Sequence, residues 1–147
     1  MITMSSERNV DMFSGLVLIL SIIALVMLII GPFAGTWQGG NIYWYSCLDC
    51  ENSTIGDYTS QIFILILLIF QIIIAVNELL PKKLISRDMT LFGLLIAIMI
   101  FGFSLIGLIS FGVYYDYAEW WVDIGFYGPV VAGVINTILL YLKHKNK

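Results

Sequence analysis

The placement of charged side chains is the feature that most constrains how this chain folds. Its 147 residues include 7 Lys and Arg and 10 Asp and Glu, and no charged residue lies within 12–48, 58–77, 89–115 or 124–142. Each gap holds the roughly 20 apolar residues that cross about 30 Å of hydrocarbon at about 1.5 Å per residue. We therefore predict four membrane-spanning helices, at about 13–33, 60–80, 89–113 and 124–142.

Composition supports this reading and excludes a water-soluble globule. The chain is 60% hydrophobic and only 12% charged, with a mean hydropathy of +0.95, whereas a soluble domain carries roughly 25% charged residues. The net charge of −3 argues against nucleic acid as a partner. The predicted fold class is an all-α integral membrane protein: a single four-helix bundle in the lipid bilayer, with short outer loops at about 34–59 and 114–123.

The basic residues give a predicted orientation. All of them lie in the N-terminal tail, the connection between the second and third spans, or the C-terminal tail: Arg8, Lys82, Lys83, Arg87, Lys143, Lys145 and Lys147. The other two connections hold acidic residues and no basic ones. Because translocation of Lys and Arg is disfavoured, we predict a multi-pass protein of the cell membrane with both termini in the cytoplasm.

All four tryptophans fall in the two predicted outer loops, at Trp37, Trp44, Trp120 and Trp121. Tryptophan favours the headgroup level of a membrane, so these residues are typical of an interfacial belt. Exposed tryptophans are also typical anchors of protein interfaces. Both interpretations stay open, and the four residues are the candidate interaction residues.

Small and amide side chains mark the expected helix contacts. Gly128, Ala132 and Asn136 are spaced by four and share one helix face, next to Gly133. Close approach and polar contacts drive helix association in lipid, so we expect this face to pack on the third helix. Gln71, in the middle of the second span, is expected to bond across helices. The apolar cores hold no ionisable residue, which disfavours a pump or a proton relay.

The first outer loop contains both cysteines of the chain, Cys47 and Cys50. A structural disulfide, a redox-active pair and half of a metal site are the three interpretations. Neither outer loop offers a second such pair or a histidine, so we predict no metal site, and no cofactor. Asn52 begins an Asn-Ser-Thr sequence and is a candidate glycosylation site.

The same loop resembles the claudin and peripheral-myelin tetraspan superfamily. Trp37 and Trp44 match the two tryptophans of that family's loop, and Trp44-Tyr45-Ser46-Cys47 reproduces its Trp-x-x-Cys spacing. Ile42-Tyr43 replaces the usual Gly-Leu, and Cys50 follows Cys47 closely. A loop of about 26 residues is short for the extracellular sheet of that family. The resemblance implies a tetraspan protein that acts by association at a cell surface.

A second resemblance is to the bacterial disulfide-oxidising quinone reductases, which carry a Cys-x-x-Cys pair in the first outer loop of four helices. This chain has no second pair in its second loop, and Asp49 and Glu51 beside the cysteines disfavour the thiolate. No catalytic residues stand out elsewhere. Our leading hypothesis is a non-catalytic protein, claudin-like or a small accessory subunit, that binds other membrane proteins or itself. Thiol-disulfide exchange and a role as a small channel or transporter component are the alternatives.

Overall fold

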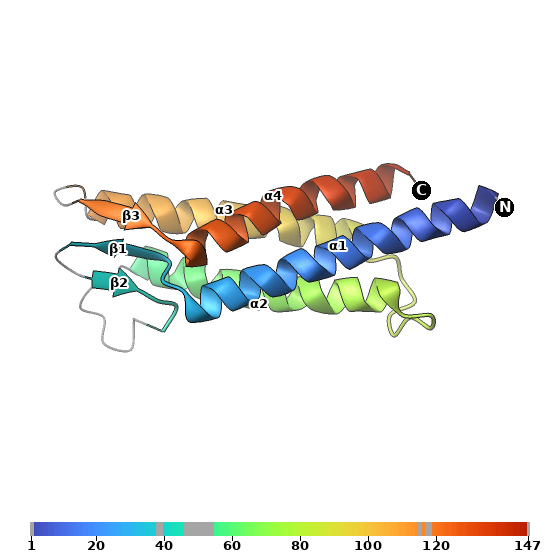
Figure 1. The fold of residues 1–147 in the computed structure, drawn as a ribbon, viewed down its shortest axis with the longest axis horizontal. Helices are drawn as coiled ribbons and strands as arrows, with labels where there is room; N and C mark the ends of the chain where they lie inside the picture. Colours follow the sequence, from blue (N-terminus) through green and yellow to red (C-terminus); the bar gives the residue numbers. More distant parts are fainter. Residues whose placement is uncertain (1, 38–39, 46–54, 115, 117–118, 147) are drawn as a thin grey trace.

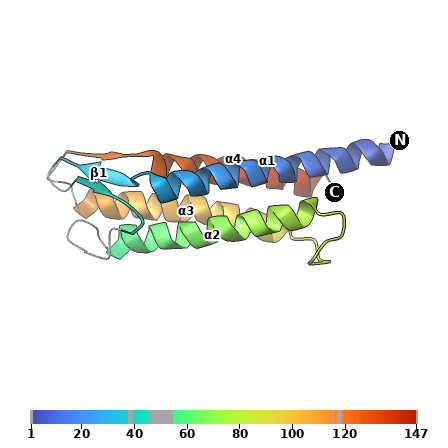
Figure 2. The ribbon, with the colours of Figure 1, turned by 60° about the horizontal axis from the view of Figure 1, so that its bottom comes forward.

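The computed structural model describes residues 2–37, 40–45, 55–114, 116 and 119–146, with side chains from residue 12 onward except that of Ile55. It contains helices α1 (Ile2–Ile30), α2 (Ile55–Leu79), α3 (Thr90–Tyr114) and α4 (Ile124–Lys145). They form an elongated antiparallel bundle (Figures 1 and 2). Both chain termini lie at one end, here called the terminal end, and three short strands lie at the other, the sheet end (Figure 1).

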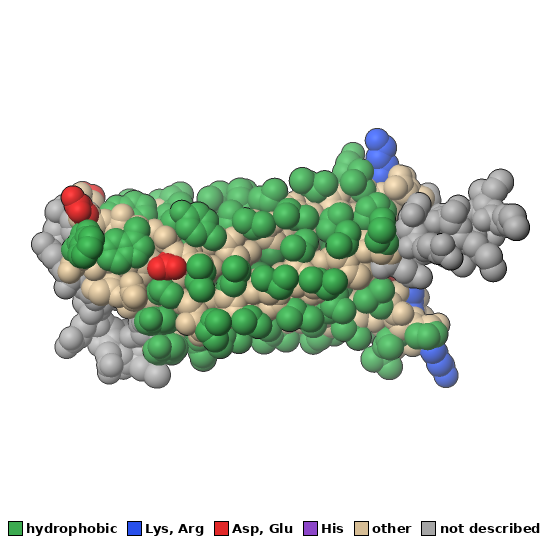
Figure 3. Space-filling model, viewed as in Figure 1, with side chains coloured by type: hydrophobic (Ala, Val, Ile, Leu, Met, Phe, Trp, Pro, Cys, Tyr) green, Lys and Arg blue, Asp and Glu red, His purple; other side chains and the backbone are tan. Residues whose placement is uncertain are grey.

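The four apolar helices predicted from the sequence are confirmed. The stretches long and apolar enough to cross a membrane are Met12–Ile30, Gly56–Leu79, Thr90–Tyr114 and Ile124–Lys145. Helix α2 begins at Ile55 rather than near residue 60, which shortens the connection before it. It ends just before Pro81, which has no N–H to continue a helix. Apolar side chains cover the shaft of the bundle between its two ends (Figure 3), as expected for a surface in contact with lipid.

A small sheet at the end of the bundle is an addition to the predicted all-α architecture. Strands β1 (Ala34–Thr36), β2 (Gly40–Ile42) and β3 (Trp120–Val122) pair antiparallel in the order β2-β1-β3. Gly35 of β1 lies opposite Asn41 on one side and Trp121 on the other. The sheet therefore joins the two predicted outer loops. Each of its three strands is only three residues long.

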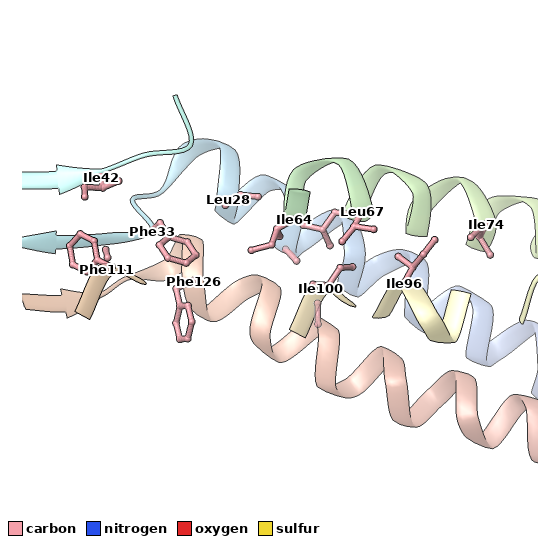
Figure 4. Packing of buried hydrophobic residues seen from close by; sticks show 14 residues of the cluster. Leu28, Phe33, Ile42, Ile64, Leu67, Ile74, Ile96, Ile100, Phe111 and Phe126 are labelled. Carbon is pink, nitrogen blue, oxygen red and sulfur yellow. The ribbon is translucent and has the colours of Figure 1, made fainter. Parts of the chain in front are cut away.

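The core runs along the bundle axis and continues to the sheet. Helices α1 and α3 each pack against both α2 and α4. Leu28, Ile64 and Ile100 meet from three of the helices (Figure 4), and each is fully buried. At the sheet end Phe33 and Phe126 contact each other edge to face, with ring centroids 5.5 Å apart. This aromatic layer connects the helices to the strands.

The small-residue face of α4 packs on α1, and the expectation that it meets the third helix is wrong. A Cβ on Gly128 would lie 2.9 Å from Met27 Sδ and 3.4 Å from the Cα of Ala24. One turn farther on, Ala132 lines the same contact, and the Asn136 amide donates a 3.0 Å hydrogen bond to Ser21 Oγ. Helix α4 lies between α1 and α3, and the face that carries Gly128, Ala132 and Asn136 is the one in contact with α1.

Gly133 packs against the other neighbour of α4, helix α3. A Cβ there would lie 3.0 Å from the backbone nitrogen of Phe101 and 3.3 Å from the carbonyl oxygen of Ala97, both on α3. Successive residues on a helix differ by about 100° in direction, so adjacent small residues open α4 to two different helices. Gln71 is fully buried, yet neither of its amide atoms has a hydrogen-bond partner among the described residues.

Candidate functional site

Six aromatic residues gather at the sheet end and define what we call the aromatic face: Trp37, Tyr43, Trp44, Tyr45, Trp120 and Trp121. Trp120 and Trp121 belong to β3, Trp37 follows β1, and the other three residues follow β2. Within this group, Trp37 of the first predicted outer loop contacts Trp121 of the second. The sequence shows tryptophans in both loops, but it does not show the contact between Trp37 and Trp121, because β1 and β3 are separated by two helices.

Two of the indoles lie over glycines. A Cβ on Gly35 would be 2.8 Å from Cζ2 of Trp121, and a Cβ on Gly112 would be 2.8 Å from Cζ2 of Trp120. Only a residue without a side chain lets each indole approach the backbone this closely. Trp120 also contacts Phe111 edge to face, with centroids 5.8 Å apart. Gly35 and Gly112 are site residues that the sequence analysis missed.

Trp37 is the most exposed member of the aromatic face. It directly follows β1, and 78% of its surface is accessible, against 37% for Trp120. Its ring contacts Trp121 at a centroid distance of 5.5 Å, so the exposed indole is supported from one side.

Trp44 fastens the aromatic face to the bundle. Its Nε1–H donates a 3.2 Å hydrogen bond to the carbonyl oxygen of Ile29, in the last turn of α1. Carbonyls in the last turn of a helix have no partner within the helix, so the indole satisfies one of them. Tyr45 contacts Trp44 edge to face and stacks on Tyr43, with a centroid distance of 5.2 Å for the stacked pair. The hydrogen bond to Ile29 and the contact with Tyr45 therefore hold Trp44 in its position.

Asp123 fixes the second outer loop to the same end. Its Oδ1 accepts a 2.7 Å hydrogen bond from the N–H of Ile124, which caps α4, while its own N–H donates to the carbonyl of Phe33. The N–H of Gly125 donates to the carbonyl of Pro32 at 3.0 Å. Backbone bonds therefore tie the start of α4 directly to the segment between α1 and β1.

The charges around the aromatic face are acidic. Asp116 and Glu119 are exposed there, and Asp57 is fully buried at the start of α2. Figure 3 shows acidic side chains at the sheet end and basic ones at the terminal end of the face in view. Because the sequence places no Lys or Arg between residues 9 and 81, or between 88 and 142, the two ends are electrostatically opposite. Positive charge on a partner would favour its binding at the sheet end.

A buried ionic cluster, which the sequence analysis also missed, lies at the terminal end. We call Ser14, Glu78, Lys83 and Lys143 the terminal clamp. Lys143 is fully buried, and its Nζ donates to Glu78 Oε2 at 3.1 Å and to Ser14 Oγ at 2.8 Å. Lys83 Nζ contacts the same carboxylate oxygen at 3.0 Å. The clamp links α1, α2 and α4 with the connection that leads to α3.

One sequence signal does point to this cluster. Residues 57, 61, 64, 68, 71, 75 and 78 of α2 alternate in steps of four and three, and every one of them is buried. Four of the seven are polar or acidic: Asp57, Gln61, Gln71 and Glu78. The steps of four and three identify the inward stripe of α2. The stripe would have placed Glu78 inside the bundle, where it requires a cation.

Several predicted site residues lie outside the part of the chain that the structure describes. Cys47, Cys50 and Asn52 are among them, so the disulfide, the redox pair and the glycosylation site stay predictions. Within the described ranges, no group of three or more His, Cys, Asp or Glu side chains is placed to hold a metal ion.

Comparison of the chain with protein-family models, with curated proteins and with solved structures gave no match.

Proposed function

We propose that this protein is a non-catalytic, multi-pass membrane protein that acts by association through its aromatic face. In this proposal it is a claudin-like tetraspan or a small accessory subunit, and its partner is another membrane protein or a second copy. Both termini are cytoplasmic, and the aromatic face lies outside the cell membrane. All the basic residues belong to the N-terminal tail, the connection between α2 and α3, or the C-terminal tail, which supports this orientation.

The observation that carries the proposal is the exposed Trp37 on a braced sheet. An indole that is 78% accessible has most of its apolar area still to bury. Its support by Trp121, together with the fastening of the sheet by Trp44 and Asp123, holds it in place before binding. A preorganised aromatic side chain loses little conformational entropy on association, which favours affinity.

The competing interpretation of the aromatic face is an interfacial belt that contacts only lipid headgroups. The two interpretations differ in what Trp37 contacts in a native membrane. We would replace it with a photo-crosslinking phenylalanine analogue, and make the same replacement at Tyr141, which is 54% exposed near the terminal end of α4. Mass spectrometry of the adducts then identifies the contact at each position.

Association predicts a discrete protein adduct at position 37 and lipid adducts at position 141. The partner identified in this way, whether another protein or a second copy, is then co-expressed and co-purified. Trp37→Ala is expected to reduce co-purification about tenfold or more, since truncation of a central interface tryptophan costs about 2 kcal/mol or more. Tyr141→Ala serves as the matched control and should leave it unchanged. Lipid adducts alone at position 37 would refute association through this face.

A further inference from the structure

A second surface, at the terminal end, carries an apolar groove. The groove has a volume of about 200 Å³ and lies between α2 and the connection 80–89. Ile72, Ile73 and Val76 of α2 form one wall, and Leu84 and Ile85 of the connection form the other. Ile73 and Val76 face outward from the bundle, where 51% and 39% of their surfaces are accessible. The groove therefore opens on the side of the helix that faces lipid.

The connection that closes this groove is held in place by two side chains of α2. Asn77 bonds both backbone groups of Ile85: Oδ1 accepts from its N–H at 2.9 Å and Nδ2 donates to its carbonyl at 3.3 Å. Glu78 binds Lys83 at 3.0 Å and accepts from the N–H of Met89 at 3.5 Å. Leu84 nevertheless stays 85% exposed. An apolar side chain held outward beside a lipid-facing groove is placed to enter the bilayer.

Positive charge flanks the two apolar residues of the connection. Lys82 and Arg87 are exposed on either side of Leu84 and Ile85. Lys83 and Lys143 both contact the Glu78 carboxylate, whereas Lys82 and Arg87 lie on the exposed side of the connection. Basic side chains at the edge of the hydrocarbon extend toward the headgroups, where they attract anionic lipid. The groove and the charges thus offer complementary surfaces to the two parts of one molecule.

We propose that this groove is a binding site for one anionic phospholipid of the leaflet at the terminal end. An acyl chain lies along Ile73 and Val76 against Leu84, and the phosphate is held by Lys82 and Arg87. The occupant is a lipid rather than a helix of a partner because the groove is apolar and short, and its flanks are cationic. The proposal is independent of the function assigned to the aromatic face.

Titration of the detergent-solubilised full chain with lipid, followed by native mass spectrometry, tests the headgroup contact. The probes are dioleoyl phosphatidylglycerol and dioleoyl phosphatidylcholine, which share their acyl chains and differ in charge. We expect tighter binding of the anionic lipid, with a loss of about fivefold for each of Lys82→Gln and Arg87→Gln. The pair Lys145→Gln and Lys147→Gln removes equal charge from the C-terminal tail and is the matched control.

Two further measurements separate a built site from general attraction to a basic surface. Val76→Phe fills the groove and is expected to reduce binding of the first phosphatidylglycerol molecule, whereas Val134→Phe, on the lipid-facing side of α4, leaves it unchanged. Inorganic phosphate at millimolar concentration should not displace the lipid, because it offers no chain for the groove. Equal losses from the tail variants and the Lys82 and Arg87 variants would overturn the proposal, as would equal binding of the two lipids or full displacement by phosphate.

Discussion

The terminal clamp gives the sharpest prediction about stability. In Lys143→Met the apolar stem of the side chain is kept and its ammonium group is removed. The variant loses the 3.1 Å contact with Glu78 and the 2.8 Å contact with Ser14. Lys143 is completely buried, and the side chain of Glu78 is only 4% exposed. Water therefore cannot readily replace the lost donor.

The expected loss in the free energy of unfolding depends on the partners that Glu78 keeps in the variant. Removal of one partner from a buried ion pair typically costs about 3–5 kcal/mol, because the remaining charge is left uncompensated. Here the carboxylate retains Lys83 at 3.0 Å and the N–H of Met89. We therefore expect a decrease of about 3 kcal/mol in the free energy of unfolding, at the lower end of that range. Removal of Lys83, whose side chain is 38% exposed, is expected to cost only about 0–1 kcal/mol.

Reversible unfolding in mixed micelles of dodecyl maltoside and SDS, followed by circular dichroism, measures these differences. Lys83→Met is the matched control, because it removes the same group from the same carboxylate at a more exposed position. The double variant Glu78→Met with Lys143→Met leaves no buried charge unpaired at this contact, so it should lie within about 1 kcal/mol of the wild type. If Lys143→Met cost no more than Lys83→Met, burial would not be what makes this contact strong.

Three other predictions concern packing inside the bundle. Gly125→Ala should lower the free energy of unfolding by about 1–3 kcal/mol, because its Cβ would lie 2.8 Å from a backbone oxygen of Pro32. Gly102→Ala, with nothing within 4 Å of the new atom, should be neutral or stabilising, and equal effects in thermal unfolding would contradict the argument. Gln71→Leu should stabilise by about 1 kcal/mol, since its buried amide has no partner among the described residues, and Ser21→Ala should destabilise by removing the acceptor of Asn136. Destabilisation by Gln71→Leu would show that the amide is satisfied in the membrane.

The sequence predicted the helices well because a single physical cost determines them. A charged residue within the hydrocarbon is expensive, so the uncharged gaps mark the spans directly. The packing of the helices was harder to predict, since Gly128 and Gly133 both favour close approach but do not identify which helix approaches. That choice depends on the arrangement of all four helices, which places α4 between α1 and α3.

The candidate sites, like the helix packing, could be predicted only in part. The four tryptophans are visible in the sequence, but the exposure of Trp37 depends on the pairing of β1 with β3, a contact between distant segments. The burial of Glu78 and Lys143 was missed because each is the first charged residue beyond an uncharged gap. Such a residue is typical of a solvated helix end. Here their opposite charges and the serine on α1 let them lie inside the protein instead.

The order of the strands also has a consequence for biosynthesis. β1 pairs with β2 locally, but its other edge is completed only by β3, which is made after two further helices. Until then one row of backbone donors and acceptors on β1 stays open, and open strand edges are templates for incorrect pairing. A chain interrupted before β3 is therefore expected to aggregate, although it already contains three of the four membrane helices.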